Sequence, residues 1–322
     1  MNHMLDIVII NYNSDKLTTA LCDKIFSFQL PFLDKIIIID NDSDLSRDFS
    51  FSFQNKNIVV KHLCSNIGFA RACNYAFSSI VTSFYCLLLN PDIEITKKSL
   101  ASCYQTLEAN PALAAISPLI LNSDHSIQHP PYYSFPSVFT EIKASLLGRR
   151  KAYFNNYSFN KTNPILDVKH ICGCFMMLNT SFIKGKLFNH NLPFSYEDLD
   201  LCKRLSFSPG HVALLASTSV IHHGGLSSGT SPNKKVIWGI IHSRLMYYSM
   251  HSSRVEYCIL ILYYILFYFL KLGILCMQFC IQLAAFSFIN STFPPKKHIS
   301  ATFLQLQGLV MYLSGSSIDF FK

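Results

Sequence analysis

Short apolar runs alternate with longer mixed stretches over the first part of the chain. The runs stand at 5–12, 35–40, 58–63 and 83–89, and they are rich in Ile, Val and Leu. Runs of this length and composition are typical of strands buried on both faces of a parallel sheet. Helical segments are expected between them, over 15–29 and 66–77. Strands that alternate with helices predict an α/β fold with a mostly parallel sheet flanked by helices.

The pattern is less regular in the middle of the chain. Residues 122–165 are rich in Asn, Ser, Tyr and Pro, which is typical of loops, with room for one short helix. Strands are expected again over 168–178, with a kink at Gly173, and over 212–216. Between them, the segment 193–205 predicts a helix that carries acidic residues at its start.

A long apolar segment, 257–295, predicts a C-terminal hydrophobic helix, and 303–313 predicts a second, shorter element. The long segment contains one charge, Lys271, and exceeds the roughly 20 apolar residues that span a bilayer. At 100° per residue its polar positions fall on one stripe roughly 80° wide. The positions on this stripe are Tyr257, Tyr264, Tyr268, Lys271, Gln278 and Gln282.

Three arrangements of this segment are open. It lies in the membrane surface with the polar stripe facing headgroups or the rest of the protein, it spans the membrane with a break at Gly273, or it is a buried core helix. The last is least favoured, because about 33 helical residues extend about 50 Å. We expect in-plane or partly inserted anchoring, supported by flanking basic residues at Arg254, Lys296 and Lys297.

Composition agrees with a folded domain that carries a membrane-seeking piece. Of 322 residues, 50% are hydrophobic and 14% charged, against a usual charged share of about 25%. This excludes a disordered chain, and 12 Gly exclude a collagen-like one. The net charge of +8 suits an anionic membrane surface or a phosphate-bearing substrate. No nucleic-acid partner is expected, because no basic run is interleaved with aromatic residues.

Cysteine usage and the N-terminus indicate the cytoplasm. The eleven cysteines form no C-x-x-C pair, and several stand in apolar runs, which favours reduced, buried thiols. Cys172 and Cys174 lack a second pair at zinc spacing. Asp6 interrupts the first apolar run, and no basic region precedes it, so a signal peptide is not expected.

Polar residues follow three of the expected strands. They are Asn11 and Tyr12, then Asp40 to Asp42, then Asn90 to Asp92. Any one of these ends alone reads as a simple strand-to-loop transition. Because ligands of such sheets bind at the carboxyl ends of the strands, the three ends together predict a binding site.

Six short motifs stand in a recognisable order. They are Ile-Asn-Tyr-Asn-Ser (10–14), Ile-Asp-Asn-Asp-Ser (39–43), Asn-Ile-Gly-Phe-Ala-Arg (66–71), Leu-Asn-Pro-Asp (89–92), Tyr-Glu-Asp-Leu-Asp-Leu-Cys (196–202) and Ile-His-His-Gly-Gly (221–225). Together they resemble family 2 glycosyltransferases, and the nearest branch resembles the rhamnosyltransferase-like enzymes of bacterial O-antigen, lipopolysaccharide and polysaccharide assembly. The resemblance covers residues 4–230.

The resemblance implies a GT-A type nucleotide-diphospho-sugar transferase fold and an inverting reaction that uses Mg²⁺ or Mn²⁺. Residues 1–234 would form the catalytic domain, with a nucleotide-binding half over 1–92 and an acceptor half over 93–234. Residues 235–322 would form a helical membrane-associating region.

The resemblance also assigns residues to the donor nucleotide. Tyr12 would pack on the base and Asp40 would accept a hydrogen bond from a pyrimidine N–H, with Asn11 and Asn90 at neighbouring strand ends. Further residues would line the loop and helix beside the nucleotide. These are Asn66, Gly68, which lets the backbone approach closely, Arg71, which can pair with a phosphate, and Asn74 on the same helical face.

Asp92 and His222 are the candidate metal ligands. Hard cations prefer carboxylate oxygens, and Asp92 stands at a strand end. The family commonly has Asp-x-Asp here, whereas this chain has Asn90-Pro91-Asp92, so the first acid is missing and a plain β-turn is the alternative. His222 would contact the metal or the diphosphate, with His223 a lesser candidate and Gly224-Gly225 closing over the site.

An inverting transfer needs one general base on the acceptor hydroxyl. By resemblance Asp198 is assigned as this base and Glu197 orients the acceptor, although the two roles are interchangeable on sequence grounds. Asp200 is expected to cap or pair on its own helix.

The expected activity is therefore transfer of a sugar from a nucleotide-diphosphate donor to a lipid-linked oligosaccharide on the cytoplasmic face of the inner membrane. By resemblance dTDP-rhamnose is the first donor expected and UDP-sugars the second. A catalytically inactive, membrane-tethered binding protein of the same fold is the alternative, supported by Asn90. A nucleotidyltransferase is disfavoured, because residues 11–16 supply no glycine-rich, basic phosphate loop.

Overall fold

The computed structural model describes residues 4–42, 57–128, 133–148, 164–224, 234–286 and 296–315. Its elements follow in the order β1 (Leu5–Asn11), α1 (Asp15–Ser27), β2 (Leu33–Asp40), β3 (Ile58–His62), α2 (Phe69–Ser79), β4 (Tyr85–Leu89), β5 (Ile93–Glu94), α3 (Lys97–Ala109), β6 (Leu113–Leu121), α4 (Val138–Leu147), β7 (Ile165–Asp167), β8 (Phe175–Asn179), η1 (Thr180–Phe182), α6 (Glu197–Leu205), β9 (His211–His222), α7 (Lys234–His251), α8 (Arg254–Phe286) and α9 (Lys296–Leu313).

One mixed sheet, with nine strands among the described residues, forms the centre of the α/β part. Its order is β3-β2-β1-β4-β8-β6-β9-β5, with β7 also paired to β9. The first four strands are parallel, as the sequence predicts. Beyond them the expected parallel pairing does not hold throughout, because β8 runs antiparallel between β4 and β6; among the described strands, β6 and β9 form the one further parallel pair.

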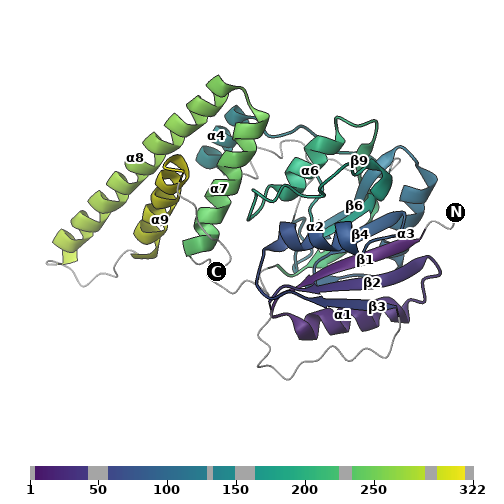
Figure 1. Cartoon of the computed structure of the whole chain (residues 1–322). Helices are drawn as coiled ribbons and strands as arrows, with labels where there is room; N and C mark the ends of the chain where they lie inside the picture. Colours follow the sequence, from purple (N-terminus) through teal and green to yellow (C-terminus); the bar gives the residue numbers. More distant parts are fainter. Residues whose placement is uncertain are drawn as a thin grey trace.

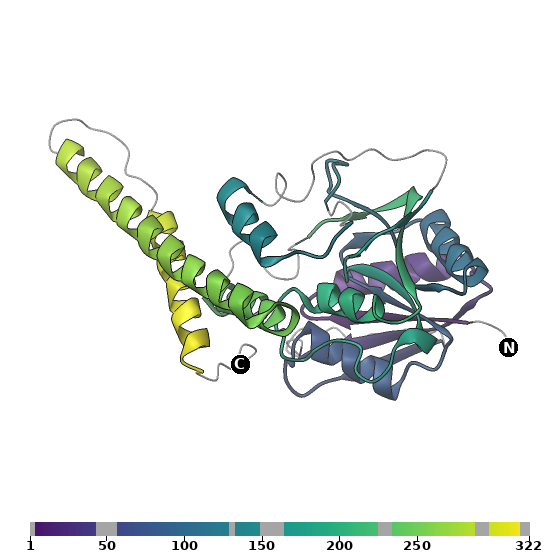
Figure 2. The same cartoon turned by 90° about the horizontal axis from the view of Figure 1, so that it is seen from above.

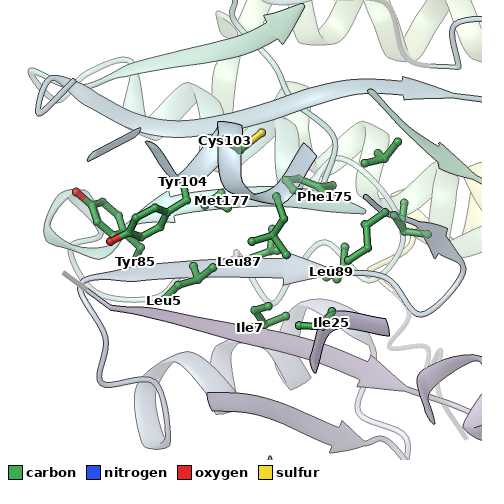
Figure 3. Packing of buried hydrophobic residues seen from close by; sticks show 14 of the residues in the cluster. Leu5, Ile7, Ile25, Tyr85, Leu87, Leu89, Cys103, Tyr104, Phe175 and Met177 are labelled. Carbon is green, nitrogen blue, oxygen red and sulfur yellow. The ribbon is translucent and has the colours of Figure 1, made fainter. Parts of the chain in front are cut away.

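Helices cover both faces of the sheet (Figure 1). On one face, α1 and α3 pack on alternate residues of the strands, such as Ile7, Leu87 and Phe175 (Figure 3). On the other face, α2 and α6 pack on residues such as Val8 and Leu88. The strands are continuous apolar runs because both of their faces are buried in this way.

The remaining helices form a separate apolar cluster beside the sheet. Helices α4, α7, α8 and α9 pack together, and Figure 2 shows α8 extending away from the sheet. In α8 the segment Arg254–Met277 is long and apolar enough to cross a membrane, and 17% of its most apolar window is buried. The core-helix arrangement is therefore wrong for the described part of the chain.

The polar stripe of α8 faces the rest of the protein. Tyr264 and Tyr268 are buried, and the Tyr257 hydroxyl donates to that of Tyr312 in α9 at 3.0 Å. Lys271 is the exception on this stripe, since its side chain is exposed. The side chains of Gln278 and Gln282 and the whole of Gly225 lie outside the described residues.

One sequence expectation about the middle of the chain differs from the structure, and another is confirmed. The strand expected over 168–178 begins only at Phe175, because the preceding segment leaves the ladder to contact α6. The short helix expected within 122–165 is α4. Helices α3 and α7 and strand β6 were not predicted.

Candidate active site

Asn11 and Asp40 end neighbouring parallel strands and are bonded to each other. The Asn11 Nδ2 donates to Asp40 Oδ1 at 3.0 Å and to Asp15 Oδ1 at 2.6 Å. On its other side, Asp40 Oδ2 lies 2.9 Å from His62 Nδ1. Asn11 is fully buried, whereas the adjacent Tyr12 is 39% exposed. Asn11 therefore orients the Asp40 carboxylate, and Tyr12 is the exposed ring beside it.

Asn66 and Gly68 shape the loop that enters α2. The Asn66 Oδ1 accepts hydrogen bonds from Gly68 N at 2.9 Å and from Asn41 Nδ2 at 3.0 Å. Gly68 has φ +82 and is the residue before the helix, a conformation that favours glycine. This geometry agrees with a backbone loop beside a ligand.

Arg71 and Asn74 lie on the exposed side of α2. Asn74 Oδ1 accepts from Phe188 N at 2.7 Å, and Asn74 Nδ2 donates to Phe188 O at 2.8 Å, so its amide holds the loop at 185–190. Arg71 lines a cavity of about 540 Å³ together with Lys186 and His190. Burial, with the nearby Lys186 and Arg71 charges, lowers the pKa of His190. Asn74 thus holds a loop of the protein in place, whereas Arg71 lines a basic cavity.

Asp92 and His222 are brought together, as expected of a metal pair. Asp92 is buried, and its Oδ1 lies 3.2 Å from His222 Nε2. The contact follows from pairing of β5 with β9, in which Ile93 is opposite His222. Asn90 at the neighbouring strand end donates its N–H to Cys174 O at 2.9 Å.

Gln128 fixes the orientation of the His222 ring, and it was not predicted. Its Nε2 donates to Asn122 Oδ1 at 2.9 Å and to His222 O at 3.0 Å, so its Oε1 is left to accept from His222 Nδ1–H at 2.7 Å. Metal-binding histidines are commonly held through the other ring nitrogen in this way. In the described part of the chain no three His, Cys, Asp or Glu side chains form a metal cluster. A pair still fits Mg²⁺ or Mn²⁺, because such ions also use substrate phosphates and water.

The Glu197–Asp198 pair opens α6 after an unusual turn. Ser195 and Tyr196 both have positive φ, at 60° and 68°. The turn brings Asp198 to the segment before β8, where its Oδ2 accepts from Gly173 N at 3.1 Å and its Oδ1 lies 3.3 Å from His170 Nε2. His170 was not predicted, because it stands in a run expected to be a strand.

The surroundings of these two acids separate their pKa values. Burial, and then the charge of Asp198, raises the pKa of Glu197 to about 8. The buried Oε2 of Glu197 has no hydrogen-bond partner among the described residues. Burial alone would also raise the pKa of Asp198, but His170 and the N–H groups of Gly173 and Leu199 bring it below its ordinary value. Near neutral pH, Glu197 is thus protonated and Asp198 is ionised.

The Asp92–His222 pair and the Glu197–Asp198 pair lie around one segment, 172–174. The pKa of the Cys174 thiol is raised by its hydrogen bond with Cys172, by burial, and by the nearby carboxylates of Asp198 and Asp92. In addition, Asn90 N donates to Cys174 O, and Gly173 N donates to Asp198 Oδ2. Both pairs therefore lie beside the backbone of residues 172–174. Asp200 instead pairs with Arg204 on its own helix at 2.9 Å, as expected, and with His251 of α7 at 2.8 Å.

Comparison with known proteins decides the family. The sequence model for "Glycosyl transferase family 2" matches residues 6–185, more than half of the chain. The chain belongs to glycosyl transferase family 2. A search of curated proteins finds no match.

A solved structure agrees on the fold. A crystal structure of GalNAc-T7 with UDP, GalNAc and Mn²⁺ superposes with a TM-score of 0.53 at 13% identity, over 76% of this chain and 49% of that one. The likeness shows the GT-A fold, and this chain matches about half the length of that protein. S. aureus TarS 1-349 with UDP-GlcNAc has a lower TM-score of 0.49, at 15% identity over 81% of this chain and 70% of that one. The mannosyltransferase PcManGT from Pyrobaculum calidifontis with GDP-Man and Mn²⁺ has a TM-score of 0.47, at 11% identity over 97% of this chain and 88% of that one.

The family match ends before the acid pair. Asp40, Asn66 and Asp92 stand within it, whereas Glu197, Asp198 and His222 lie beyond residue 185. The case for these last three residues therefore depends on geometry: Asp198 contacts Gly173 and His170, and His222 contacts Asp92, all within the matched part, while Glu197 is adjacent to Asp198.

Proposed function

We propose that the chain is an inverting, divalent-metal-dependent glycosyltransferase that moves a sugar from a nucleotide-diphosphate donor to a lipid-linked oligosaccharide. The observation that supports this most is the meeting of the Asp92–His222 pair and the Glu197–Asp198 pair around residues 172–174. Displacement at a sugar carbon requires a cation site beside the leaving diphosphate and a carboxylate base beside the acceptor hydroxyl. The two pairs of residues would supply these.

The donor nucleotide would lie over the ends of β1 and β2. Asp40, held by Asn11 and His62, would accept from the base, and the exposed ring of Tyr12 would pack on it. GalNAc-T7, which shares the fold, was solved with UDP and Mn²⁺, and this supports a nucleoside diphosphate and a divalent cation. By sequence resemblance, dTDP-rhamnose is the first donor to test and UDP-sugars are the second.

Asp92 and His222 would hold the cation, and Asn90 would stand beside the phosphates. When bound, Mg²⁺ or Mn²⁺ neutralises charge that develops on the leaving diphosphate. Gln128 keeps the Nε2 of His222 turned toward Asp92.

The acid pair would act on the acceptor. Asp198 remains ionised and takes the proton of the attacking hydroxyl on the face opposite the diphosphate, which inverts the anomeric centre. Glu197, protonated near neutral pH, donates a hydrogen bond that orients the acceptor.

A lipid-linked acceptor suits the outer face of α8. This face carries large exposed apolar side chains along its length. They include Val255, Leu262, Leu266, Phe269, Leu270, Ile274 and Met277. We propose that this face lies in or partly inserts into the cytoplasmic surface of the inner membrane, where a lipid-linked substrate is also confined.

A catalytically inactive binding protein of the same fold is the second candidate. The observation that favours it is Asn90, which stands where the family commonly has an acid. Such a protein would bind a sugar nucleotide and show no turnover.

A thermal-shift screen tests the donor site. UDP, dTDP and GDP, each with and without Mn²⁺, should include one that stabilises the full-length protein, and Asp40→Ala should reduce that shift. Asp34→Ala is the matched control, because Asp34 lies on the same strand and its side chain is 45% exposed. If no nucleotide shifts the melting temperature under either condition, the donor-site proposal fails.

A further inference from the structure

The buried carboxylate of Glu141 lies outside the candidate active site. Glu141 of α4 is 2% exposed and sits in the cluster formed by the C-terminal helices. Its Oε1 accepts from Tyr264 Oη of α8 at 2.8 Å and lies 3.3 Å from Arg244 Nε of α7. Its Oε2 accepts from Tyr248 Oη of α7 at 3.3 Å and from Tyr196 Oη at 3.5 Å.

Three tyrosine hydroxyls donate to Glu141, whereas Arg244 lies beside it as a cation whose Nε makes no hydrogen bond among the described residues. Arg244 supplies a charge opposite to that of a carboxylate, and its Nη1 also donates to Tyr264 Oη at 3.2 Å. Removing one member of such a buried network leaves the others without partners, which is costly. The bond from Tyr264, at 2.8 Å, is the shortest of the three, and the bond from Tyr196, at 3.5 Å, is the longest.

Tyr196 connects this network to the acid pair. It is the residue directly before Glu197, and with Ser195 it forms a turn in which both residues have positive φ. Such a conformation is unfavourable for residues other than glycine and persists only where the surroundings hold it. The buried Tyr196 ring contacts Tyr247, with ring centroids 5.3 Å apart, and its carbonyl accepts from Asp200 N at 2.9 Å.

We propose that Glu141 is a positioning residue for the acid pair: by holding the Tyr196 hydroxyl it fixes the turn that directs Glu197 and Asp198 toward residues 172–174. The role of the acid pair in this proposal rests on the proposed function. Through Tyr264, the same carboxylate also joins α8 to the turn. The seating of the apolar helix against α4 and α7 is thereby coupled to the geometry of the candidate base.

The chain offers a matched control on the same helix. Tyr263 precedes Tyr264 and also contacts α4, but its hydroxyl bonds to Ser145 and not to Glu141. Glu141→Gln, Tyr196→Phe and Tyr264→Phe each remove a part of the network, and Tyr263→Phe removes a comparable hydroxyl outside it.

Steady-state kinetics of the full-length variants separates positioning from simple stability. A misplaced acid pair should lower kcat by about 10- to 100-fold in Glu141→Gln and Tyr196→Phe, with a smaller fall in Tyr264→Phe, while the donor KM and the Tyr263→Phe kcat stay unchanged. If Glu141→Gln and Tyr196→Phe lower only the melting temperature, and kcat measured below it is normal, the positioning role is contradicted.

Hydrogen–deuterium exchange of the same proteins needs no substrate. The amides of residues 195–202 should exchange faster in Glu141→Gln and Tyr196→Phe than in wild type or Tyr263→Phe, with exchange in β1 unchanged. Equal exchange in all four proteins overturns the proposal. Absence of turnover in the wild type contradicts the proposed function alone, and the exchange measurement then still decides the inference.

Discussion

Glu197 and Asp198 are adjacent in the chain, yet they meet different surroundings. Asp198 accepts two backbone N–H groups and faces His170, whereas the Oε2 of Glu197 is buried without a partner in the described structure. The pair is thus divided into one ionised and one protonated group, which supports Asp198 as the base.

The raised pKa of Glu197 predicts a pH-dependent stability. Folding shifts this pKa from 4.5 to about 8, so the folded state binds the proton more tightly than the unfolded chain. Stability should therefore fall as pH rises from about 4.5 to about 8 and then level off. Melting curves in a metal-free buffer check this, with Glu197→Gln as the comparison. A difference between the two proteins that does not grow across this window would contradict the assignment.

Gln128 should matter for metal affinity, because it fixes the His222 ring. Gln128→Ala should weaken Mn²⁺ binding by about 10- to 100-fold, the usual effect of losing such a support. Titration calorimetry with Mn²⁺ in the presence of the stabilising nucleotide measures it. Ser123→Ala is the control, since Ser123 contacts the neighbouring His223. Equal affinity in wild type and Gln128→Ala would remove His222 from the metal site.

The residues at the strand ends were predictable, because the change from apolar to polar residues marks where each short run ends. Asn11, Asp40 and Asp92 all stand at such ends and lie where expected. Gln128 and His170 were not, because Gln128 stands 94 residues from its partner His222 and His170 interrupts an apolar run. Asn74 has the expected position on its helix, but its amide is bonded to a loop more than one hundred residues away.

At the scale of elements, α8 combines a polar inner stripe with an apolar outer face. Replacing Leu262, Leu266 and Leu270, each more than half exposed, with Ser should leave the fold intact and weaken binding to vesicles. The expected loss is roughly tenfold for each leucine that inserts, from about 1.5 kcal/mol of burial.

Co-sedimentation with vesicles that contain anionic lipid measures this loss. Phe207→Ser is the control, because Phe207 is 81% exposed on the α/β part. If the triple variant binds vesicles as well as the control, or if the wild type does not bind them, the outer face of α8 does not contact membrane.

The long apolar patterns gave reliable elements and the weak patterns did not. Strands β1, β2 and β4 were predictable because both faces are buried. The prediction of a strand over residues 168–174 was wrong, because this segment leaves the sheet and contacts α6. Helix α7 has apolar, basic and aromatic residues on all sides, because it packs against α8, α9 and the 185–196 loop. The sequence therefore shows no single apolar stripe from which this helix could be predicted.

At the scale of the whole molecule, the sheet and the C-terminal helices meet at the acid pair. Helix α6 packs its apolar side on the sheet through Leu201 and Leu205, while Tyr196 and Leu199 belong to the cluster of α4, α7 and α8. Figure 1 shows α6 between these two parts. The proposed base thus stands where the sheet adjoins a helical layer with an apolar outer face, as the proposed transfer to a lipid-linked acceptor would require.

The most direct test of this account is the release of nucleoside diphosphate from sugar nucleotides by the full-length protein in vesicles that contain bacterial lipid extract. Wild type should release the diphosphate from at least one of dTDP-rhamnose, a UDP-sugar and a GDP-sugar, and only with Mg²⁺ or Mn²⁺ present. Asp198→Asn keeps the shape of the side chain, so it should bind that donor normally while turnover falls by about 10²- to 10⁴-fold, the scale of a positioned base. Normal turnover in Asp198→Asn, or donor binding without any turnover in wild type, would contradict the account.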